Sequence, residues 1–299
     1  MYEQISSNKR KSFFLVLFFL CLIFLMMWAF EQVTDWGTGG LVLAAVIAVT
    51  MTWGSYFYSD KIVLAVSRAR PVTKEEYPHL YNVVDGLAIA AGLPKPRCYV
   101  IDDTAPNAFA SGRNPKNAVI VVTKGLLQKL NRAELEGVVA HEMAHIKNYD
   151  VLVQTLAVVM VGIVALLSDW ILRSFFWGGG RRRRSSKDSG NAGMILVVIA
   201  LVLAILAPLT AQLLKLAVSR KREFLADANG ALLTRYPPGL ASALRKLAAD
   251  TEPLEAANKA TAHLYIVNPL KDIKRGGAMN KLFSTHPPIE QRISALENM

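Results

Sequence analysis

The sequence predicts a mainly helical α+β protein that is anchored in a membrane and has a small β-sheet beside a helix carrying an HExxH motif. Three observations support this fold class. Of the 299 residues, 53% are hydrophobic and only 19% are charged. Two uncharged apolar runs lie near the N-terminus, and a region with frequent charges and turns follows them. That second region contains the pentapeptide His141 to His145.

The two N-terminal apolar runs are long enough to cross a lipid bilayer. The first, Phe13 to Phe30, contains 18 residues without a charge. At 1.5 Å per residue it reaches about 27 Å, close to the thickness of the hydrocarbon core. The second, Leu41 to Tyr58, is also uncharged. Residues 1–58 are therefore expected to form a transmembrane hairpin.

The placement of basic residues predicts the orientation of this hairpin. Lys9, Arg10 and Lys11 precede the first run, whereas the connection to the second contains acidic residues but no Lys or Arg. Because basic residues favour the cytoplasmic side, both ends of the hairpin should be cytoplasmic. Much of the net charge of +11 lies beside apolar segments. Anionic lipid is therefore the expected partner of these charges, and no nucleic acid is expected.

Residues 59–150 have the pattern of a cytosolic, catalytic part. The segment Glu75 to Gly92 predicts a helix, and three short β-leaning runs follow it: Arg97 to Ile101, Ala108 to Ser111 and Ala118 to Thr123. These runs predict the small sheet. Asn131, with Glu134 three residues later, fits a capping box that opens the HExxH helix.

The later part of the chain divides into a second hydrophobic hairpin, 151–218, and a helical catalytic part, 219–299. The apolar stretches within 151–177 and 193–214 are short for full spans. If they crossed fully, the loop bearing Arg181 to Arg184 would lie outside, against the preference of basic loops for the cytoplasm. The sequence therefore leaves open whether this hairpin crosses the membrane.

The two cysteines, Cys21 and Cys98, do not form a redox or disulfide framework. They lie far apart and have no CxxC spacing. Both are expected to be reduced, buried, small apolar residues.

The HExxH motif carries the chemistry. On a helix, the i,i+4 spacing of His141 and His145 puts both imidazoles on one face, where they can bind one Zn²⁺. Glu142 lies beside them. A catalytic zinc lowers the pKa of its bound water, and a neighbouring carboxylate can take the proton during attack on an amide. The motif therefore predicts a zinc site, against the alternative of a chance match on an amphipathic helix.

A third zinc ligand must come from elsewhere, and Glu223 is the best candidate. His₂Glu is an established catalytic zinc set. Asp227, at i+4 from Glu223, could accept a hydrogen bond from a ligand histidine and orient it. Taken alone, this segment fits a solvated helix face of mixed charge better than a metal site.

Several segments, in the same order, resemble one family. They are Ala91 to Pro94, Pro106 to Arg113, Val122 to Leu127, the HEMAH helix continued by Asn148 and Asp150, the Glu223/Asp227 segment, and Thr285 to Pro288 with Arg292. Over nearly its whole length the chain resembles the HtpX-type membrane metallopeptidases, gluzincins related to the CaaX prenyl proteases. The resemblance implies a zinc endopeptidase of the cytoplasmic (inner) membrane, multi-pass and with its active site facing the cytosol. Its implied substrates are misfolded or damaged membrane proteins, with a role in stress response and quality control.

The resemblance also implies roles for individual residues. His141, His145 and Glu223 would bind zinc. His286 would help to stabilise the oxyanion, with Arg292 as its basic companion. The segment Asn107, Ala108, Phe109, Ala110 and Ser111 would form the edge strand on which an extended substrate lies. Arg220 is a further candidate, as a partner of an acidic side chain near the site.

Two alternatives to this function remain. A processing peptidase of narrow specificity would resemble the prenyl proteases, but those enzymes carry more membrane spans than this chain can supply. A catalytically silent scaffold or holdase would keep the fold without turnover. Such a scaffold has no need of a carboxylate at Glu142, and a structural zinc site is expected to close with four protein ligands. The sequence does not predict the oligomeric state.

Overall fold

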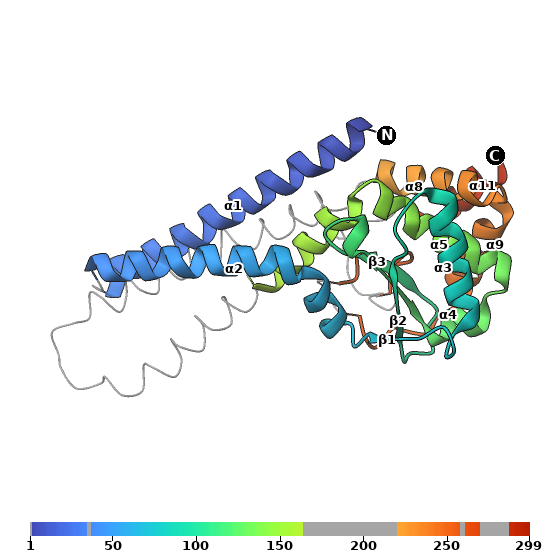
Figure 1. The fold of residues 1–299 in the computed structure, drawn as a ribbon, viewed down its shortest axis with the longest axis horizontal. Helices are drawn as coiled ribbons and strands as arrows, with labels where there is room; N and C mark the ends of the chain where they lie inside the picture. The colour runs from blue at the N-terminus through green and yellow to red at the C-terminus, as the bar shows by residue number, and fades with distance from the viewer. Residues whose placement is uncertain (1, 35–36, 164–219, 258–260, 270–286) are drawn as a thin grey trace.

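The computed structural model describes residues 2–34, 37–163, 220–257, 261–269 and 287–299. Two long helices, α1 (Tyr2–Thr34) and α2 (Gly37–Val66), extend away from a body that contains the sheet and the other labelled helices (Figure 1). The sheet lies inside this body, with helices α3, α5 and α8 on one side of it in this view.

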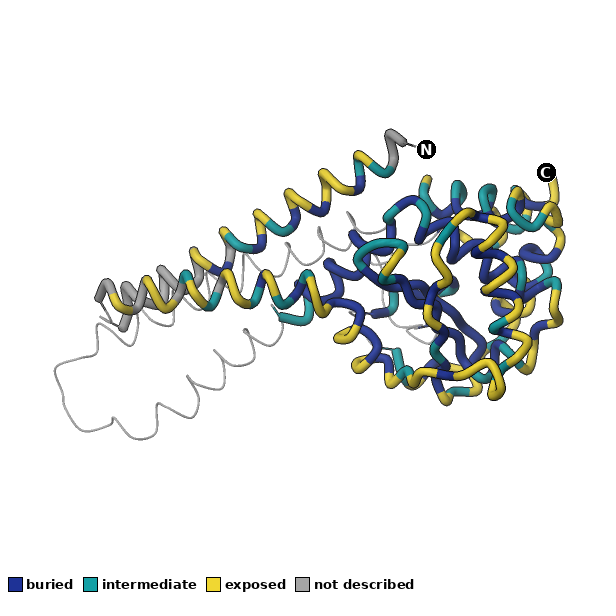
Figure 2. The backbone as a smooth tube through the Cα atoms, viewed as in Figure 1, coloured by how far each residue is buried: buried dark blue, intermediate teal, exposed yellow. Residues whose placement is uncertain are grey.

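Helix α1 is docked along one narrow stripe. Its buried residues, at spacings of three or four, are Asn8, Ser12, Leu15, Phe19 and Ile23. The apolar ones pack against Leu152, Leu156 and Met160 of the helix 150–163. Most of the other side chains described between residues 5 and 24 of α1 are exposed or half-buried, which gives the alternation of colours along this part of the helix in Figure 2. Because the described part of α1 contacts the body along one stripe only, apolar side chains on its other faces are not covered by protein.

Among the described residues, no single helix is both long enough and apolar enough to cross a membrane. Two consecutive helices, α5 (Arg132–Lys147) and Asp150–Ile163, reach the required length and hydropathy together, but they are bent by 83°. Of the second hairpin predicted for 151–218, the structure describes only the helical residues up to 163. The remainder of that prediction lies outside the described residues.

The expectation that both cysteines are buried is wrong for one of them. Cys98 is buried in the body, whereas Cys21 is exposed on α1. The reason is that the buried stripe of α1 passes through Phe19 and Ile23, and Cys21 lies on another face of the helix.

The sheet has four strands in the order β1-β2-β4-β3. The predicted strands are confirmed as β2 (Arg97–Ile101), β3 (Ala108–Ser111) and β4 (Val119–Thr123), and a two-residue strand, β1 (Arg70–Pro71), adds to β2. Strand β4 pairs in parallel with β2 and antiparallel with β3, so the sheet is mixed. Strand β3 therefore lies at one edge.

The helices begin and end where local chemistry dictates. Helix α3 (Pro78–Ala91) starts three residues later than predicted because Pro78 fits the first helical turn, and it ends at Gly92, whose φ of 66° suits glycine. A 3-10 turn (Pro115–Asn117) precedes β4. The other described helices are α4 (Lys124–Lys129), α8 (Arg220–Thr234), α9 (Pro237–Ala249) and α11 (Ile289–Glu297).

Helix α5 is the centre of the body. It packs against α3, α8, α9 and β3, and nearly every residue from Glu134 to Ile146 is buried. Its apolar side chains Val138, Val139, Met143 and Ile146 belong to the largest hydrophobic cluster. A helix that is buried all round can carry polar side chains only where those side chains are paired or functional.

Candidate metal centre

The start of α5 fixes the register of the HExxH motif. The Asn131 side chain accepts from the backbone N–H of Glu134 at 3.0 Å, and the Glu134 carboxylate accepts from the backbone N–H of Asn131 at 2.8 Å. This capping box is the one the sequence predicted. Ser242 and Lys246 of α9 donate to the same carboxylate, each at 2.7 Å, and so tie the two helices together.

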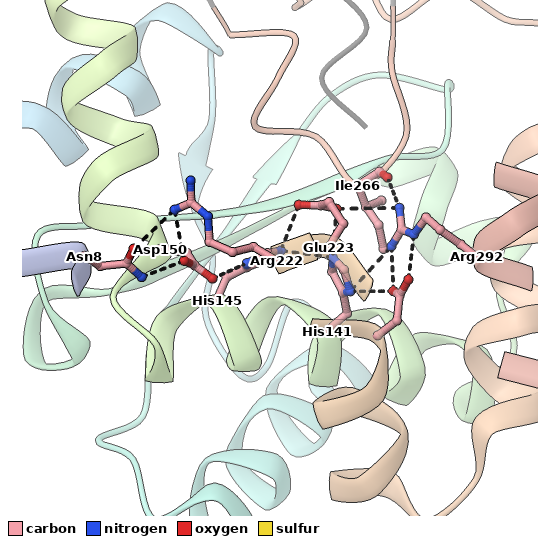
Figure 3. A network of polar contacts seen from close by, with 9 residues as sticks. Asn8, His141, His145, Asp150, Arg222, Glu223, Ile266 and Arg292 are labelled. Carbon is pink, nitrogen blue, oxygen red and sulfur yellow. Dashed lines mark hydrogen bonds and ion pairs between the residues drawn. The ribbon is translucent and has the colours of Figure 1, made fainter. Parts of the chain in front are cut away.

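Helix α8 brings Glu223 to the two histidines of α5 (Figure 3). The Nε2 atoms of His141 and His145 lie 3.2 Å apart. The Glu223 carboxylate oxygens lie 3.8 Å from the first and 3.4 Å from the second. All three side chains are buried, and one ligand atom from each falls within 4.8 Å of the others, so the group could hold one metal ion.

The contact between α8 and α5 depends on a glycine. A Cβ atom at Gly230 would lie 3.0 Å from the backbone nitrogen of His141 and 3.2 Å from its Cα. Because Gly230 has no side chain, the two helix backbones approach closely at the first metal-binding histidine. The same approach places Glu223 and Asp227, earlier on α8, at the site.

Asp227 orients His141. Its Oδ1 lies 2.8 Å from the Nδ1 of His141, and Arg292 of α11 donates to both carboxylate oxygens, through Nε at 2.8 Å and Nη2 at 2.7 Å. Burial alone would raise the pKa of Asp227, but the charge and hydrogen bonds of Arg292 hold that pKa well below its usual range. Arg292 also donates to the carbonyl oxygen of Ile266 at 2.8 Å. The carboxylate is thus ionised and fixed.

Asp150 does the same for His145. Its Oδ2 lies 3.0 Å from the Nδ1 of His145. Helix α5 ends at Lys147, and Tyr149 then takes a left-handed conformation with φ of 60°, which is uncommon for a non-glycine residue. This turn sends the chain into the helix 150–163 and brings Asp150 back beside the histidine five residues earlier.

The donor set fits a zinc ion. Because a carboxylate accepts from each Nδ1–H, the neutral imidazoles present lone pairs at Nε2, and these face one another and the Glu223 carboxylate. A zinc ion between these three atoms, or a proton on one of the nitrogens in the metal-free protein, offsets the repulsion between their lone pairs. Burial lowers the pKa of His145, but its hydrogen bond to Asp150 and the charge of Glu223 raise that pKa to about 9. Two imidazoles and one carboxylate form a usual ligand set for catalytic zinc.

Glu142 lies in the same buried centre. It is 2% exposed, and its carboxylate accepts from the backbone N–H of Ala110 in β3. Burial is the main cause that raises the pKa of this side chain. A carboxyl group with a raised pKa, next to a metal site, suits proton transfer near neutral pH.

The predicted substrate strand is the edge strand β3, but part of its outer edge is already paired. The backbone N–H of Ile266 donates to the carbonyl of Ala108 at 2.9 Å. The Asn107 side chain donates to the carbonyl of Val267 at 2.9 Å. Segment 266–267 thus covers the beginning of β3, whereas Ala110, further along the strand, contacts Glu142.

Comparison with known proteins decides the family. Residues 74–299 match peptidase family M48. The chain belongs to this family. As an M48 peptidase it is a zinc-dependent metalloprotease, in agreement with the prediction from the HExxH motif.

Relatives and one solved structure agree with M48 membership over the full chain. A protease HtpX homolog of Dictyoglomus turgidum is 51% identical over 298 residues, which cover 100% of this chain and 94% of the relative. A protease HtpX homolog of Listeria monocytogenes is 42% identical over 307 residues that cover both chains completely. The crystal structure of S. mikatae Ste24p has a TM-score of 0.51 at 19% identity, over 99% of this chain and 67% of that one, and shares its fold.

The remaining predicted site residues of this M48 peptidase are Arg220, His286 and Arg292, and the structure describes two of them. Arg220 is exposed at the start of α8, whereas Arg222, two residues later, reaches the Asp150 carboxylate at 3.2 Å. His286 lies outside the described residues. Arg292 contacts the site through Asp227, and its predicted partnership with His286 stays a prediction.

Sequence reasoning gave no role at the site to Asp150, Arg222 or Asn8, and it offered a lipid-facing position for Arg222. In the structure Asp150 contacts His145, and Arg222 and Asn8 contact Asp150. Asp150 follows the HExxH helix closely enough to be a candidate, but its position depends on the left-handed turn at Tyr149. Asn8 lies 142 residues from Asp150 in the chain, and no local pattern links the two.

Proposed function

We propose that this M48 peptidase is a membrane-bound zinc endopeptidase in which His141, His145 and Glu223 hold the metal and Glu142 is the catalytic base. The observation that carries the proposal is the convergence of these three ligands from two helices, with Glu142 buried beside them. When bound, zinc supplies an acidified water and a Lewis acid for the scissile carbonyl.

The chain's own residues prepare the site for this chemistry. Asp227 and Asp150 each hold a ligand histidine in the tautomer that leaves Nε2 free to bind metal. Glu142 accepts a proton from the attacking water and can later return it to the leaving amine. Arg292 keeps the Asp227 carboxylate in place.

The substrate is proposed to lie along β3, from Asn107 to Ser111. An extended peptide can add to an edge strand through main-chain hydrogen bonds, which recognise the backbone and tolerate many side chains. The Ala110 N–H that contacts Glu142 is the β3 group nearest to the chemistry. We keep His286 as the proposed group that stabilises the oxyanion.

The surface of α1 and α2 supports a location in the membrane. The large exposed hydrophobic side chains of α1 include Phe13, Phe14, Leu17, Phe18 and Phe24, and those of α2 include Val42, Leu43, Val46, Val49 and Trp53. Apolar surface of this extent marks contact with lipid or with another protein. We propose that α1 and α2 form the predicted hairpin of residues 1–58, with anionic lipid at its basic end.

The orientation is proposed from the same elements. The basic residues before Phe13 favour the cytosolic side. Asn8 contacts Asp150, so the N-terminus and the metal site lie together. The active site, assembled from residues 59–150 and 219–299, would then face the cytosol from the cytoplasmic membrane. Flexible segments of misfolded or damaged membrane proteins are the proposed substrates, which is a quality-control role.

Glu142→Gln tests the catalytic part of the proposal. The full chain is purified in detergent, zinc is quantified, and cleavage of an unfolded protein is followed for the wild type and the variant. The variant should keep about one zinc per chain and lose about 100- to 10,000-fold in cleavage rate, because a positioned acid–base group contributes that much. Cleavage by the variant at the wild-type rate would remove Glu142 from the chemistry.

The same measurement separates the alternatives. A wild-type protein that holds zinc without cutting any unfolded protein would favour the scaffold or a processing enzyme of narrow specificity. Loss of zinc from the wild type would instead contradict the ligand set.

A further inference from the structure

A buried chain of hydrogen bonds runs from the first helix to the metal centre (Figure 3). Asn8 of α1 is 3% exposed. Its side-chain Nδ2 donates to the Oδ1 of Asp150 and to the carbonyl of Asn148, each at 2.8 Å. The other carboxylate oxygen of Asp150 accepts from His145. Asn8 is therefore two hydrogen bonds away from the metal-binding nitrogen of His145.

The Asp150 carboxylate depends on donors from three separate elements. It is 2% exposed, so water contributes little to its solvation. Its Oδ1 accepts from Asn8 of α1 and from the Nη1 of Arg222 in α8 at 3.2 Å, and its Oδ2 accepts from His145 of α5. The carbonyl oxygen of the Asn8 side chain lies 3.4 Å from the same Nη1. The Asn8 amide thus fills the position between Asp150 and Arg222, donating to one and accepting from the other.

The docking of α1 brings Asn8 to this position. The apolar stripe that begins with Leu15 packs on Leu152 and Leu156 of the helix that Asp150 opens. At the same end of α1, the Lys9 ammonium lies 4.8 Å from the centre of the Tyr149 ring, on the left-handed residue before Asp150. Helix α1 therefore contacts both the turn and the carboxylate that orient His145.

We propose that Asn8 is a positioning residue of the zinc centre, and that the N-terminal helix completes the surroundings of His145. The Asn8 carboxamide holds one oxygen of Asp150, which leaves the other aligned with the imidazole. This inference rests on the proposed zinc site and extends it to a helix outside the catalytic part. Groups that orient a metal ligand from behind commonly change metal affinity about 10- to 100-fold when they are removed.

Asn8→Leu tests the inference in the full-length protein in detergent. Leucine has a similar volume and keeps the helix packed, but it offers no donor to Asp150. Ser12→Ala, one turn later on the same buried stripe, is the matched control, because Ser12 contacts no acidic group in the described structure. Zinc affinity is measured by competition with a chelator, and the ligand geometry by the visible absorption spectrum of the Co²⁺-substituted protein.

The expected result is a loss of zinc affinity of about tenfold or more in Asn8→Leu, with an altered Co²⁺ spectrum, and wild-type values in Ser12→Ala. Asn8→Asp keeps the side-chain shape and places a carboxylate oxygen against Asp150, so it should weaken zinc binding as well. Wild-type affinity and spectrum in both Asn8 variants would overturn the inference. Equal losses in Ser12→Ala would overturn it too, because packing of α1 would then account for the effect.

Failure of the proposed zinc site gives a different result. In that case the wild type itself binds no zinc at this centre and gives no Co²⁺ spectrum of a mixed nitrogen and oxygen site. Thermal unfolding of the metal-free proteins, followed by far-ultraviolet circular dichroism, shows whether each variant is folded before its metal affinity is compared.

Discussion

At the scale of single residues, the site consists of charged groups that are each held by a partner. His141 and His145 are oriented by Asp227 and Asp150, and both carboxylates are in turn held by arginines, Arg292 and Arg222. Buried charges of this kind are tolerated only when they are paired. The metal-free centre should therefore respond strongly to protons and to loss of one partner.

Zinc binding should release a proton. In the metal-free protein the pKa of His145 is raised to about 9, so this side chain is charged at pH 7.5, whereas a zinc-bound imidazole is neutral. Zinc affinity should rise by about tenfold per pH unit from pH 6.5 to 8.5 and level off above the raised pKa. Calorimetry in buffers of different ionisation enthalpy measures the released proton. Affinity that does not change over this pH range would contradict the prediction.

Arg292→Leu should destabilise the protein more than the same change at an exposed arginine. It leaves the Asp227 carboxylate buried without its charged partner, at a cost of about 3–5 kcal/mol. Arg245→Leu is the control, since Arg245 pairs with Glu297 at half-exposed positions and should contribute about 0–1 kcal/mol. Thermal unfolding in detergent compares the two. Equal stability of both variants would show that the Arg292–Asp227 pair contributes little.

At the scale of elements, the site is the contact between α5 and α8. In the proposed site, helix α5 supplies two ligands and the base, and α8 supplies the third ligand and Asp227. The backbones approach at Gly230 and His141, so the helix spacing and the metal geometry are linked. A change in the distance between the two helices should therefore change the affinity for zinc.

Gly230→Ala should lower zinc affinity and stability together. The added methyl group would lie 3.0–3.2 Å from backbone atoms of His141, and such overpacking costs about 1–3 kcal/mol. Gly86→Ala is the matched control, because a Cβ there meets nothing within 4 Å in α3, and it should stabilise the helix by about 0.5–1 kcal/mol. Unfolding and zinc competition measure both effects. A Gly230→Ala protein with wild-type zinc affinity would show that the site adapts to helix displacement.

At the scale of the whole molecule, two apolar helices extend from a body that carries the chemistry (Figure 1). Helix α1 contacts the body through one stripe, and the proposed hairpin places its other faces in lipid. This arrangement would hold the active site close to the membrane surface. It also joins the anchor to the metal centre through Asn8.

Cysteine labelling should report the proposed orientation. His79 is exposed on α3, far along the chain from α1, and His79→Cys should react with a membrane-impermeant maleimide in inverted vesicles but not in intact cells. Wild-type protein is the control. Its Cys98 is buried, and its Cys21, exposed on α1, should be shielded by lipid until the membrane is dissolved. Labelling of the His79→Cys protein from outside intact cells would reverse the proposed orientation.

Local patterns in the sequence were sufficient for much of the fold and for two of the three proposed metal ligands. The bounds of β2 and β3 and the capping box at Asn131 follow from nearby residues, because turns, caps and β-propensity act over a few positions. The HExxH spacing likewise places two proposed ligands and the proposed base on one buried helix. The choice of Glu223 as third ligand also needed the family resemblance, since its segment alone fits a solvated helix face.

Only the tertiary structure decided which groups support those ligands. Asp150 reaches His145 because Tyr149 adopts a left-handed turn, and Arg222, not Arg220, lies against that carboxylate. Asn8, 142 residues from Asp150 in the chain, joins them because an apolar stripe docks α1 on the helix 150–163. Contacts between distant segments depend on how helices pack, and helix packing is set by the summed burial of many side chains. The sequence by itself therefore determined that this is a zinc-dependent peptidase and proposed the residues that bind the metal, and the packing determined what holds those residues in place.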